Sequence, residues 1–521
     1  MKKILPLILV FSLVLSLLAG CVPEDRPYEP TGDALAAEDA DLRATEPTGD
    51  GFNQELTLIY YPDRSLNPFT CADFTNQVIL SLIYQSLFSV GRDNEVVPIL
   101  CESYECSANY KTYTFYLDSN AKFSDGTRVT LDDVLASFEA AKGSNYFAGR
   151  FIHINSFAIN GEGITFTLDT PMEDFLLLMD IPIVKASQVE AENPVGSGPY
   201  VLGQGLSGPY LRRNLEWWCS SPDLAATGDS ILLVEAENNI QIRDQFQFGD
   251  VGLVCTNPCS DSYADYRCDY ELWEVDTGIM VYIGCNVGYS DIFASPTMRA
   301  ALTYGIDRDF LVSEYYNNFA EAATLPMSPS NPYYSKSLAS KYAYDPVQFI
   351  NSVSRAGMPG EAVELLVNSD DSLRLRVARA IANALTDLGL DTVTVEKPTQ
   401  AYVETLKACN YDLYLGETRL STTMDMTPFL RTWGNLTWGG IADPNLYTLC
   451  QGALENSGNY YDLHKAMADD GRIVPVVFLN YAVYAARGLL TTLQPSRSGI
   501  FHYSLGRTEA DALIPIDYGI G

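Results

Sequence analysis

Histidine and basic side chains are scarce in this sequence. Only three of its 521 residues are histidines, and 33 Lys and Arg stand against 66 Asp and Glu, which gives a formal net charge of −33. A surface of this charge excludes nucleic acid and anionic lipid as partners. It still permits an anionic ligand, because a pocket can hold local arginines.

The common catalytic signatures are also missing. The sequence contains no HExxH, no GxSxG and no Walker A motif. One GxGxxG match occurs at residues 203–208, but Pro209 and then a strand-like segment follow it, whereas a dinucleotide site requires a helix there. We therefore expect a hairpin turn at this position, no catalytic residues, no cofactor and no enzymatic activity.

Apart from its first residues, the chain has no apolar run long enough to cross a membrane. Lys2 and Lys3 precede an apolar stretch at residues 4–18, which is short for a membrane span and typical of a signal peptide. The stretch ends in Leu-Ala-Gly and then Cys21, which resembles a bacterial lipobox; the alternative is an ordinary secretion signal with a chance cysteine. We expect Cys21 to be lipidated, and the Pro-, Gly- and acid-rich residues up to 51 to form a disordered tether.

Ten of the 11 cysteines remain if Cys21 carries lipid. An even number outside the cell permits disulfides, and Cys101–Cys106 is the first candidate pair. Cys255, Cys259 and Cys268 are also close in sequence. Zinc is the alternative for the pair at 255 and 259, but no second ligand pair accompanies it, so we predict no metal site.

The pattern of the remaining chain is mixed α/β. Strands are predicted at residues 56–61 and 113–117, and a helix at 76–87. Another helix is predicted to begin after Thr130, which is a plausible N-cap, with Val134, Leu135 and Phe138 on its buried face.

Several motifs occur in an order that resembles one protein family. The segment at 122–134 (KFSDGTRVTLDDV) is the most specific of them. The others are LNPF at 66–69, LIYQSLF at 82–88, GSGPY at 196–200, NLEWW at 214–218, GDV at 249–251, TMRAALTYGIDR at 297–308, YDP at 344–346 and AG at 356–357. Together they resemble the family-5 extracellular solute-binding proteins, the peptide- and nickel-binding components of bacterial ABC importers. Most of these motif residues have a structural explanation in turns, caps and packing.

The resemblance implies an α/β, periplasmic-binding-protein-like two-lobe fold with an extra domain. Two chain crossings, near residues 284–286 and 479–480, would form the hinge. The implied division is a signal peptide at 1–20, a lipidated Cys and acidic tether at 21–51, domain I at 52–92, 196–284 and 479–521, domain II at 93–195, and domain III at 285–478.

The resemblance also implies a function. A lipid-anchored, monomeric, extracytoplasmic protein would capture a small molecule, most simply a peptide, by closing its cleft. It would deliver that ligand to permease subunits with an associated ATPase. A sugar or a metal chelate is the alternative ligand, and a sensor that no longer transports is the alternative role.

The implied ligand contacts lie on both lobes. A loop at 416–420 is expected after a strand at 411–415, and it offers Glu417, Thr418 and Arg419; Arg419 is suited to hold a carboxylate. Peptide binders of the family carry an Asp near the position of Leu420, and Asp425 replaces it only if the loop runs differently. The other expected contacts are Tyr60, Tyr61 and Tyr282 as cleft walls, Asn286 at the first crossing, and Trp433 and Trp438 as an aromatic floor.

Overall fold

The computed structural model describes residues 56–71, 73–206, 208–219, 229–259, 266–356, 362–490, 493–497 and 499–500. The chain divides into two units, residues 1–53 and 54–521, and everything below concerns the second. Cys21 and the predicted tether lie outside the described residues. No described helix combines the length and the apolarity that a membrane crossing demands.

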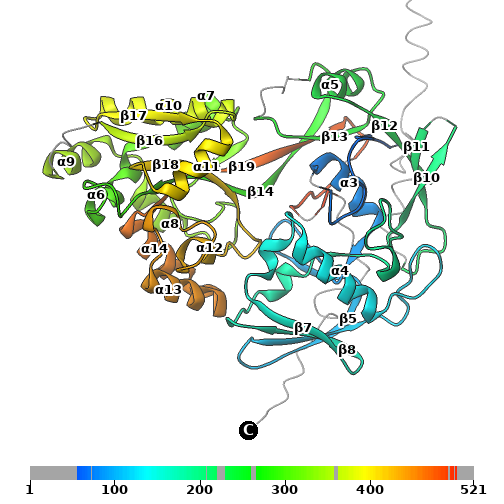
Figure 1. Ribbon diagram of the computed structural model, residues 1–521. Helices are drawn as coiled ribbons and strands as arrows, with labels where there is room; N and C mark the ends of the chain where they lie inside the picture. The colour runs from blue at the N-terminus through cyan, green and yellow to red at the C-terminus, as the bar shows by residue number, and fades with distance from the viewer. Residues whose placement is uncertain are drawn as a thin grey trace, which may run out of the picture. The chain divides into compact units, whose positions relative to one another are not determined.

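One mixed sheet of eleven strands forms the framework (Figure 1). Its order is β10-β11-β12-β1-β13-β19-β14-β18-β16-β17, and β15 pairs with β19 outside this path. The strands are β1 (Thr57–Tyr60), β10 (Tyr200–Gly205), β11 (Gly208–Arg213), β12 (Ser230–Glu235), β13 (Leu253–Thr256), β14 (Tyr270–Cys285), β15 (Ala320–Ala322), β16 (Val363–Asn368), β17 (Thr392–Lys397), β18 (Leu413–Arg419) and β19 (Ile473–Ala486). Gly205 ends β10 and pairs with Gly208 at the start of antiparallel β11, so the predicted hairpin is confirmed.

A second sheet of four strands has the order β5-β6-β8-β7. Its strands are β5 (Cys101–Cys106), β6 (Thr112–Leu117), β7 (Ile154–Asn160) and β8 (Gly163–Leu168). Short antiparallel pairs complete the strands: β2 (Gln85–Ser86) with β9 (Pro182–Ile183), and β3 (Phe88–Val90) with β4 (Val96–Pro98).

Helices pack against the main sheet both around β1 and β13 and around β16 and β17 (Figure 1). They are α3 (Phe74–Ile83), α4 (Leu131–Gly143), α5 (Asn239–Gln247), α6 (Pro296–Ala301), α7 (Arg308–Tyr315), α8 (Lys336–Ala339), α9 (Pro346–Ala356), α10 (Ser372–Asp387), α11 (Thr399–Ala408), α12 (Thr427–Leu430), α13 (Pro444–Glu455) and α14 (Tyr460–Asp470). Helix α3 packs on β1 and β13, whereas α10 packs on β16 and β17.

The long strands β14 and β19 join the two lobes of the fold (Figure 1). Residues 270–276 of β14 pair with 480–486 of β19. Residues 279–284 pair with 473–479 of β19, and residues 279–285 pair with β18 on the other side. The register breaks between Asp276 and Ile279, opposite Asn480 and Leu479. We call residues 56–276 and 480–500 the first lobe, and residues 279–479 the second lobe.

This break corrects the position of one predicted crossing. The second crossing lies at 479–480 as expected, but the first lies at 276–279 and not near 284–286. Cys285 is already deep in the second lobe, where it pairs with Leu413. Gly278 has φ +69°, a conformation that other residues rarely adopt, and it allows the irregular step in β14. The division into three domains stays a prediction.

The most specific motif holds structure, as expected. Thr130 and Asp133 form a capping box at the start of α4, and Asp125 accepts a hydrogen bond from the Thr127 amide in the preceding turn. Val134 and Phe138 are fully buried on α4, but Leu135 is only half-buried, so its predicted place on the buried face is wrong.

Arg308 in the later motif is likewise structural. Its side chain is 4% exposed, and its guanidinium donates to the carbonyls of Ala323, Pro475 and Thr303. Asp307 caps α7 by accepting from the Phe310 amide. These bonds tie α7 to β19 and leave no group free for a ligand.

The predicted disulfide between Cys101 and Cys106 is wrong. The two residues are the first and last of β5. Strand residues rise by about 3.3 Å each, so the Cα atoms lie roughly 16 Å apart, whereas a disulfide requires less than about 7 Å. The Cys101 thiol donates to the Ser103 carbonyl instead, and the Cys106 thiol to the Ser107 carbonyl.

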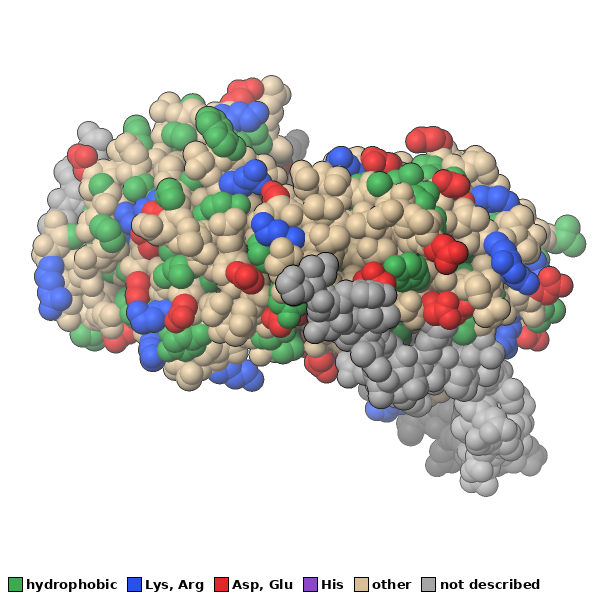
Figure 2. Space-filling model, turned by 90° about the horizontal axis from the view of Figure 1, so that it is seen from below, with side chains coloured by type: hydrophobic (Ala, Val, Ile, Leu, Met, Phe, Trp, Pro, Cys, Tyr) green, Lys and Arg blue, Asp and Glu red, His purple; other side chains and the backbone are tan. Residues whose placement is uncertain are grey.

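Charged side chains of both signs are mixed on one face of the molecule (Figure 2). On the face that Figure 2 shows, acidic and basic side chains are interspersed and no large patch of one sign forms. Net charge therefore favours solubility and gives no guide to where a ligand binds.

Candidate functional site

The segment 416–419 belongs to a strand and not to the predicted loop. β18 runs through Arg419 because it pairs with β14 up to the pair Ile279–Arg419. Side chains alternate along a strand, so Glu417 and Arg419 share one face. Glu417 is an ion-pair partner of Arg374 at 2.9 Å, and Thr418 is half-buried.

Arg419 reaches the other lobe. Its guanidinium carbon lies 5.1 Å from the ring centroid of Tyr146, just before the 3₁₀ helix η1 (Ala148–Phe151) of the first lobe. A cation over an aromatic face is attracted to it. Arg419 was predicted to bind ligand from the second lobe, and here it contacts a residue of the first lobe.

Tyr282 lies in the interior of the second lobe. It is 2% exposed, its ring packs edge-on against Phe429 at 5.1 Å and Tyr414 at 5.7 Å, and burial raises its pKa to about 12. A Cβ on Gly416 would lie 2.6 Å from the Tyr282 ring, so the glycine makes room for it. We refer to Tyr282, Tyr414 and Phe429 as the second-lobe aromatic cluster; Tyr282 is part of it and does not form an open cleft wall.

Asn286 also has a structural role. Its side chain is 1% exposed and donates to the carbonyls of Cys409 and Tyr411, while its oxygen accepts from the amides of Gly288 and Tyr289. These bonds use the whole amide group, so the structure does not offer it to a ligand.

The two tryptophans do not form a common floor. Trp433 is 91% exposed, whereas Trp438 is half-buried in the 3₁₀ helix η7 (Trp438–Gly440). A fully exposed ring buries no surface of its own, so the structure does not bring Trp433 into a site with the other predicted contacts.

Tyr60 and Tyr61 follow each other at the end of β1. Tyr61 is 6% exposed, lies under the Arg64 guanidinium at 4.2 Å, and its amide donates to Asn76. Tyr60 is half-buried, and burial together with the charges of Glu192 and Glu235 raises its pKa. Neither lines the pocket described next.

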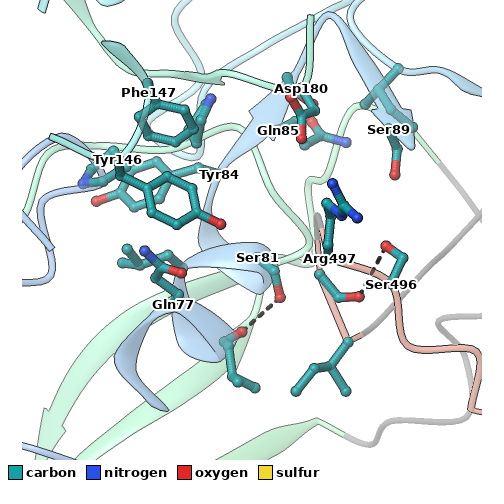
Figure 3. A pocket seen from close by; sticks show the side chains of 18 of the residues that line it. Gln77, Ser81, Tyr84, Gln85, Ser89, Tyr146, Phe147, Asp180, Ser496 and Arg497 are labelled. Carbon is teal, nitrogen blue, oxygen red and sulfur yellow. Dashed lines mark hydrogen bonds between the residues drawn. The ribbon is translucent and has the colours of Figure 1, made fainter. Parts of the chain in front are cut away.

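A pocket of about 110 Å³ opens in the first lobe between α3, the turn before η1, Asp180 and the described residues Ser496, Arg497, Gly499 and Ile500 (Figure 3). In the close-up, Tyr146 and Phe147 lie on one side of it, and Gln85, Asp180 and Arg497 on the other. The polar and aromatic lining residues include Phe74, Gln77, Ser81, Tyr84, Gln85, Ser89, Tyr146, Phe147, Arg150, Asp180 and Arg497. We call this the first-lobe pocket. Its wall Tyr146 is the residue that Arg419 contacts from the second lobe.

Arg150 is held rigidly in the pocket wall. Its Nη2 lies 2.9 Å from Asp180, and its guanidinium stacks 4.6 Å from the Phe147 ring centroid and 5.8 Å from that of Tyr146. Gln85 is fixed in a similar way, because its Oε1 accepts from the Trp218 indole at 2.8 Å. The pocket therefore has pre-oriented polar groups between aromatic faces, as small-molecule sites do.

Arg497 connects the pocket with the crossing between the lobes. It forms an ion pair with Asp276, where the register of β14 breaks, and donates to the Ser421 carbonyl of the second lobe. Gly278 leaves the space for it, since a Cβ there would lie 2.5 Å from Arg497 Nη1.

A second contact between the lobes is a buried histidine. His153, 3% exposed, directs Nε2 to Asp425 of the second lobe at 3.0 Å and Nδ1 to Asp169 at 3.1 Å. Burial alone would lower the pKa of His153, but Asp425 and Asp169 outweigh it and raise that pKa; His153 in turn holds the pKa of Asp425 below its usual value despite burial. Asp425 is thus committed to His153 and does not replace the missing amine-binding Asp in this arrangement.

No metal centre is found in the part of the chain that the structure describes, since no three His, Cys, Asp or Glu residues there are grouped to hold an ion. The site is a pocket lined by polar and aromatic side chains, with arginines in its wall, and it can bind a ligand.

A sequence profile decides the family of this chain. The profile of the bacterial extracellular solute-binding proteins, family 5, matches residues 95–440. The chain belongs to this family. The match contains the signature at 122–134, the wall residues Tyr146, Arg150 and Asp180, and the strand that carries Arg419.

Two of the similar proteins are binding proteins by name. The glutathione-binding protein GsiB of Escherichia coli O6:K15:H31 is 25% identical over 343 residues, which cover 63% of this chain and 66% of GsiB, just under two thirds of that protein. The ABC transporter substrate binding protein CtaP from Listeria monocytogenes has a similar structure, with a TM-score of 0.67, 18% identity, and coverage of 87% of this chain and 98% of CtaP. NikA from Brucella suis in complex with Fe(III)-EDTA gives a TM-score of 0.67, 16% identity, and coverage of 86% and 98%. At these identities the solved structures show the two-lobe α/β fold.

Sequence reasoning missed the residues that line the pocket. Gln85 lies in the motif at 82–88, which we assigned to the fold, and Tyr146 and Arg150 follow the signature helix without a motif of their own. An Arg three residues after a Tyr-Phe pair in an acidic chain was the available signal. Its meaning depends on Asp180 and Phe147 lying beside it, which only the tertiary structure shows.

Proposed function

We propose that this family-5 solute-binding protein is the substrate-binding component of an ABC importer and captures short peptides, including glutathione-like ones. The observation that carries the proposal is the first-lobe pocket, whose aromatic faces and fixed polar groups suit a peptide, next to the Arg419–Tyr146 contact between the lobes. GsiB, a glutathione-binding protein by name, supports the ligand class.

The proposed mechanism is a shift of population between lobe arrangements. A ligand that contacts the first-lobe pocket and Arg419 binds one arrangement better than the others, so it favours that arrangement. The protein then acts as a monomer, presents a surface made by both lobes to permease subunits, and leaves ATP hydrolysis to their ATPase. No bond in the ligand is made or broken.

A metal chelate is the second candidate ligand. NikA in complex with Fe(III)-EDTA shares the fold, and Arg150 and Arg497 in the pocket offer donors to the carboxylates of a chelator. A thermal-shift screen of the full chain with glutathione, trialanine, Fe(III)-EDTA and a disaccharide separates these classes. Stabilisation by the peptides alone supports the proposal, whereas stabilisation by Fe(III)-EDTA or the sugar alone contradicts it.

We further propose that a lipid on Cys21 anchors the protein to the cell membrane outside the cytoplasm. The support is the run of basic, apolar and small residues before Cys21. Cys21→Ser is expected to abolish labelling by a fatty-acid probe and to release the protein or leave it unprocessed. Continued lipid labelling of the mutant would contradict the anchor.

A further inference from the structure

Two hydrogen-bond donors in the wall of the first-lobe pocket are left without an acceptor. Nη1 of Arg150 and Nε2 of Gln85 are buried, and no atom of the described residues accepts from either. Gln85 is 3% exposed, and the Arg150 side chain is 12% exposed. Buried donors are almost always paired in folded proteins, so two unpaired donors lining one pocket indicate that a ligand supplies the acceptors.

The neighbours of both groups fix where these donors point. Asp180 takes Nη2 of Arg150 while Phe147 supports the guanidinium plane, so Nη1 is the end that stays available. The Trp218 indole takes Oε1 of Gln85, so the amide keeps its NH₂ end for another partner. Neither donor can be satisfied by a simple rotation without breaking a bond that already exists.

The chemistry of the two unpaired donors favours a carboxylate as the acceptor, because a hydrogen bond from a guanidinium to a carboxylate is charge-assisted. Arg150 and Arg497 line the pocket, and Asp180 is the single carboxylate among the described lining residues. Each arginine already has a carboxylate partner, Asp180 for Arg150 and Asp276 for Arg497, so the unpaired Nη1 of Arg150, and not a surplus of positive charge, selects the acceptor. A planar carboxylate has two oxygens, which can accept from a guanidinium and from an amide NH₂ that line the same pocket.

We propose that Arg150 and Gln85 form a subsite for a free carboxylate of the ligand. The substrate class is then short peptides with an unblocked carboxylate, whose remaining atoms lie against Tyr146 and Phe147. This inference rests on the proposed function and makes it more specific.

Calorimetric titration of the full chain tests the subsite with two matched pairs of probes: trialanine and trialanine amide, and glutathione and its diethyl ester. The free acids are expected to bind at least tenfold more tightly than the blocked forms. Gln85→Glu keeps the acceptor for Trp218 but replaces the donor with a charge that repels a carboxylate, and Arg150→Lys keeps the charge but removes Nη1.

Each variant is expected to weaken binding of the acids roughly tenfold to a hundredfold, the range for a charge-assisted hydrogen bond, and to change binding of the blocked forms less than threefold. Arg379→Gln is the matched control, because its exposed ion pair with Glu396 lies in the second lobe; it should bind all probes like the parent. Melting temperatures of all variants are measured alongside.

The outcomes separate this inference from the proposed function. If the peptides bind but acids and blocked forms bind equally, or if both variants bind acids like the parent, the carboxylate subsite is refuted and the peptide function stands. If only Fe(III)-EDTA or the sugar binds, the peptide function fails and the subsite fails with it. If one variant loses its fold, the other decides alone.

Discussion

Each lobe holds a group of aromatic side chains, and the two groups differ in the space they leave. In the second-lobe aromatic cluster, Tyr282, Tyr414 and Phe429 are at most 2% exposed, and glycines at 284 and 416 are needed because a Cβ there would lie 2.1 and 2.6 Å from Tyr414 and Tyr282. In the first-lobe pocket, Tyr146 and Phe147 face a cavity of about 110 Å³ with arginines in its wall. Aromatic content alone therefore does not locate a site; the unfilled space beside polar groups does.

Removing an aromatic ring gives the largest expected contrast between the two groups. Phe429→Ala should lower the free energy of unfolding by about 3–5 kcal/mol, because it leaves a cavity in a closed cluster. Ligand contacts should stay as they are. Phe74→Ala, in the first-lobe pocket, is the matched control. It should lose less stability than Phe429→Ala but should bind the peptide more weakly than the parent does. Urea denaturation and titration with a bound peptide measure both. Weakened binding with unchanged stability in Phe429→Ala would reverse the comparison.

Replacing His153 should have the second largest effect on stability, and the size of that effect should depend on pH. Its pKa is raised in the folded state, so its contribution to stability is complete below the unfolded value of about 6.5 and is lost as the pH rises through the folded value. The pKa of Asp425 is lowered, so the contribution of Asp425 is lost as the pH falls through its own folded value. The bond between the lobes is thus strongest from about pH 4 to about pH 6.5.

His153→Gln should therefore be less stable than the parent by about 1–3 kcal/mol at pH 5.5, with a smaller difference at pH 9. Subtracting variant from parent at each pH removes the opposite contribution of His464. The pKa of that buried histidine is lowered to about 3, so it destabilises the parent and the variant alike as the pH falls below about 6.5. A difference that grows as the pH rises would contradict the assignment of charge to His153.

The two-lobe fold was predicted from the order of the family motifs, and single elements were predicted from local signals. The N-cap Thr130, the hairpin at 203–208 and the strand at 113–117 each depend on neighbours in sequence. The sites were less predictable. Tyr282 and Asn286 were assigned to the cleft by their place along the chain, but packing against Phe429 and bonds to Cys409 and Tyr411 commit them to the interior. Arg419 was predicted to lie in a loop after the strand at 411–415. Pairing with Ile279 instead makes it the last residue of that strand.

The contact between Arg419 and Tyr146 is expected to have a smaller effect than either change above. A double-mutant cycle with Arg419→Ala and Tyr146→Ala should give a coupling energy of about 0.5–1 kcal/mol for ligand binding, because one residue of each lobe contributes to the same contact. Arg379→Ala with Tyr146→Ala provides the uncoupled pair. Additive effects in the first cycle would show that Arg419 acts apart from the first-lobe pocket.

Trp433→Ala should have the smallest effect. The ring is 91% exposed, so its removal should change the free energy of unfolding by less than about 0.5 kcal/mol and leave peptide binding unchanged. Denaturation and calorimetry of this one variant suffice. A clear loss of affinity would restore Trp433 to the site.

Hydrogen exchange with and without a bound peptide decides whether the first-lobe pocket holds the ligand. Glutathione or trialanine should protect amides in α3 and at residues 146–150, which surround the first-lobe pocket, together with the end of β18 at Arg419. Protection confined to the strands of the second-lobe aromatic cluster, with none at 74–89 or 146–150, would show that the ligand binds elsewhere.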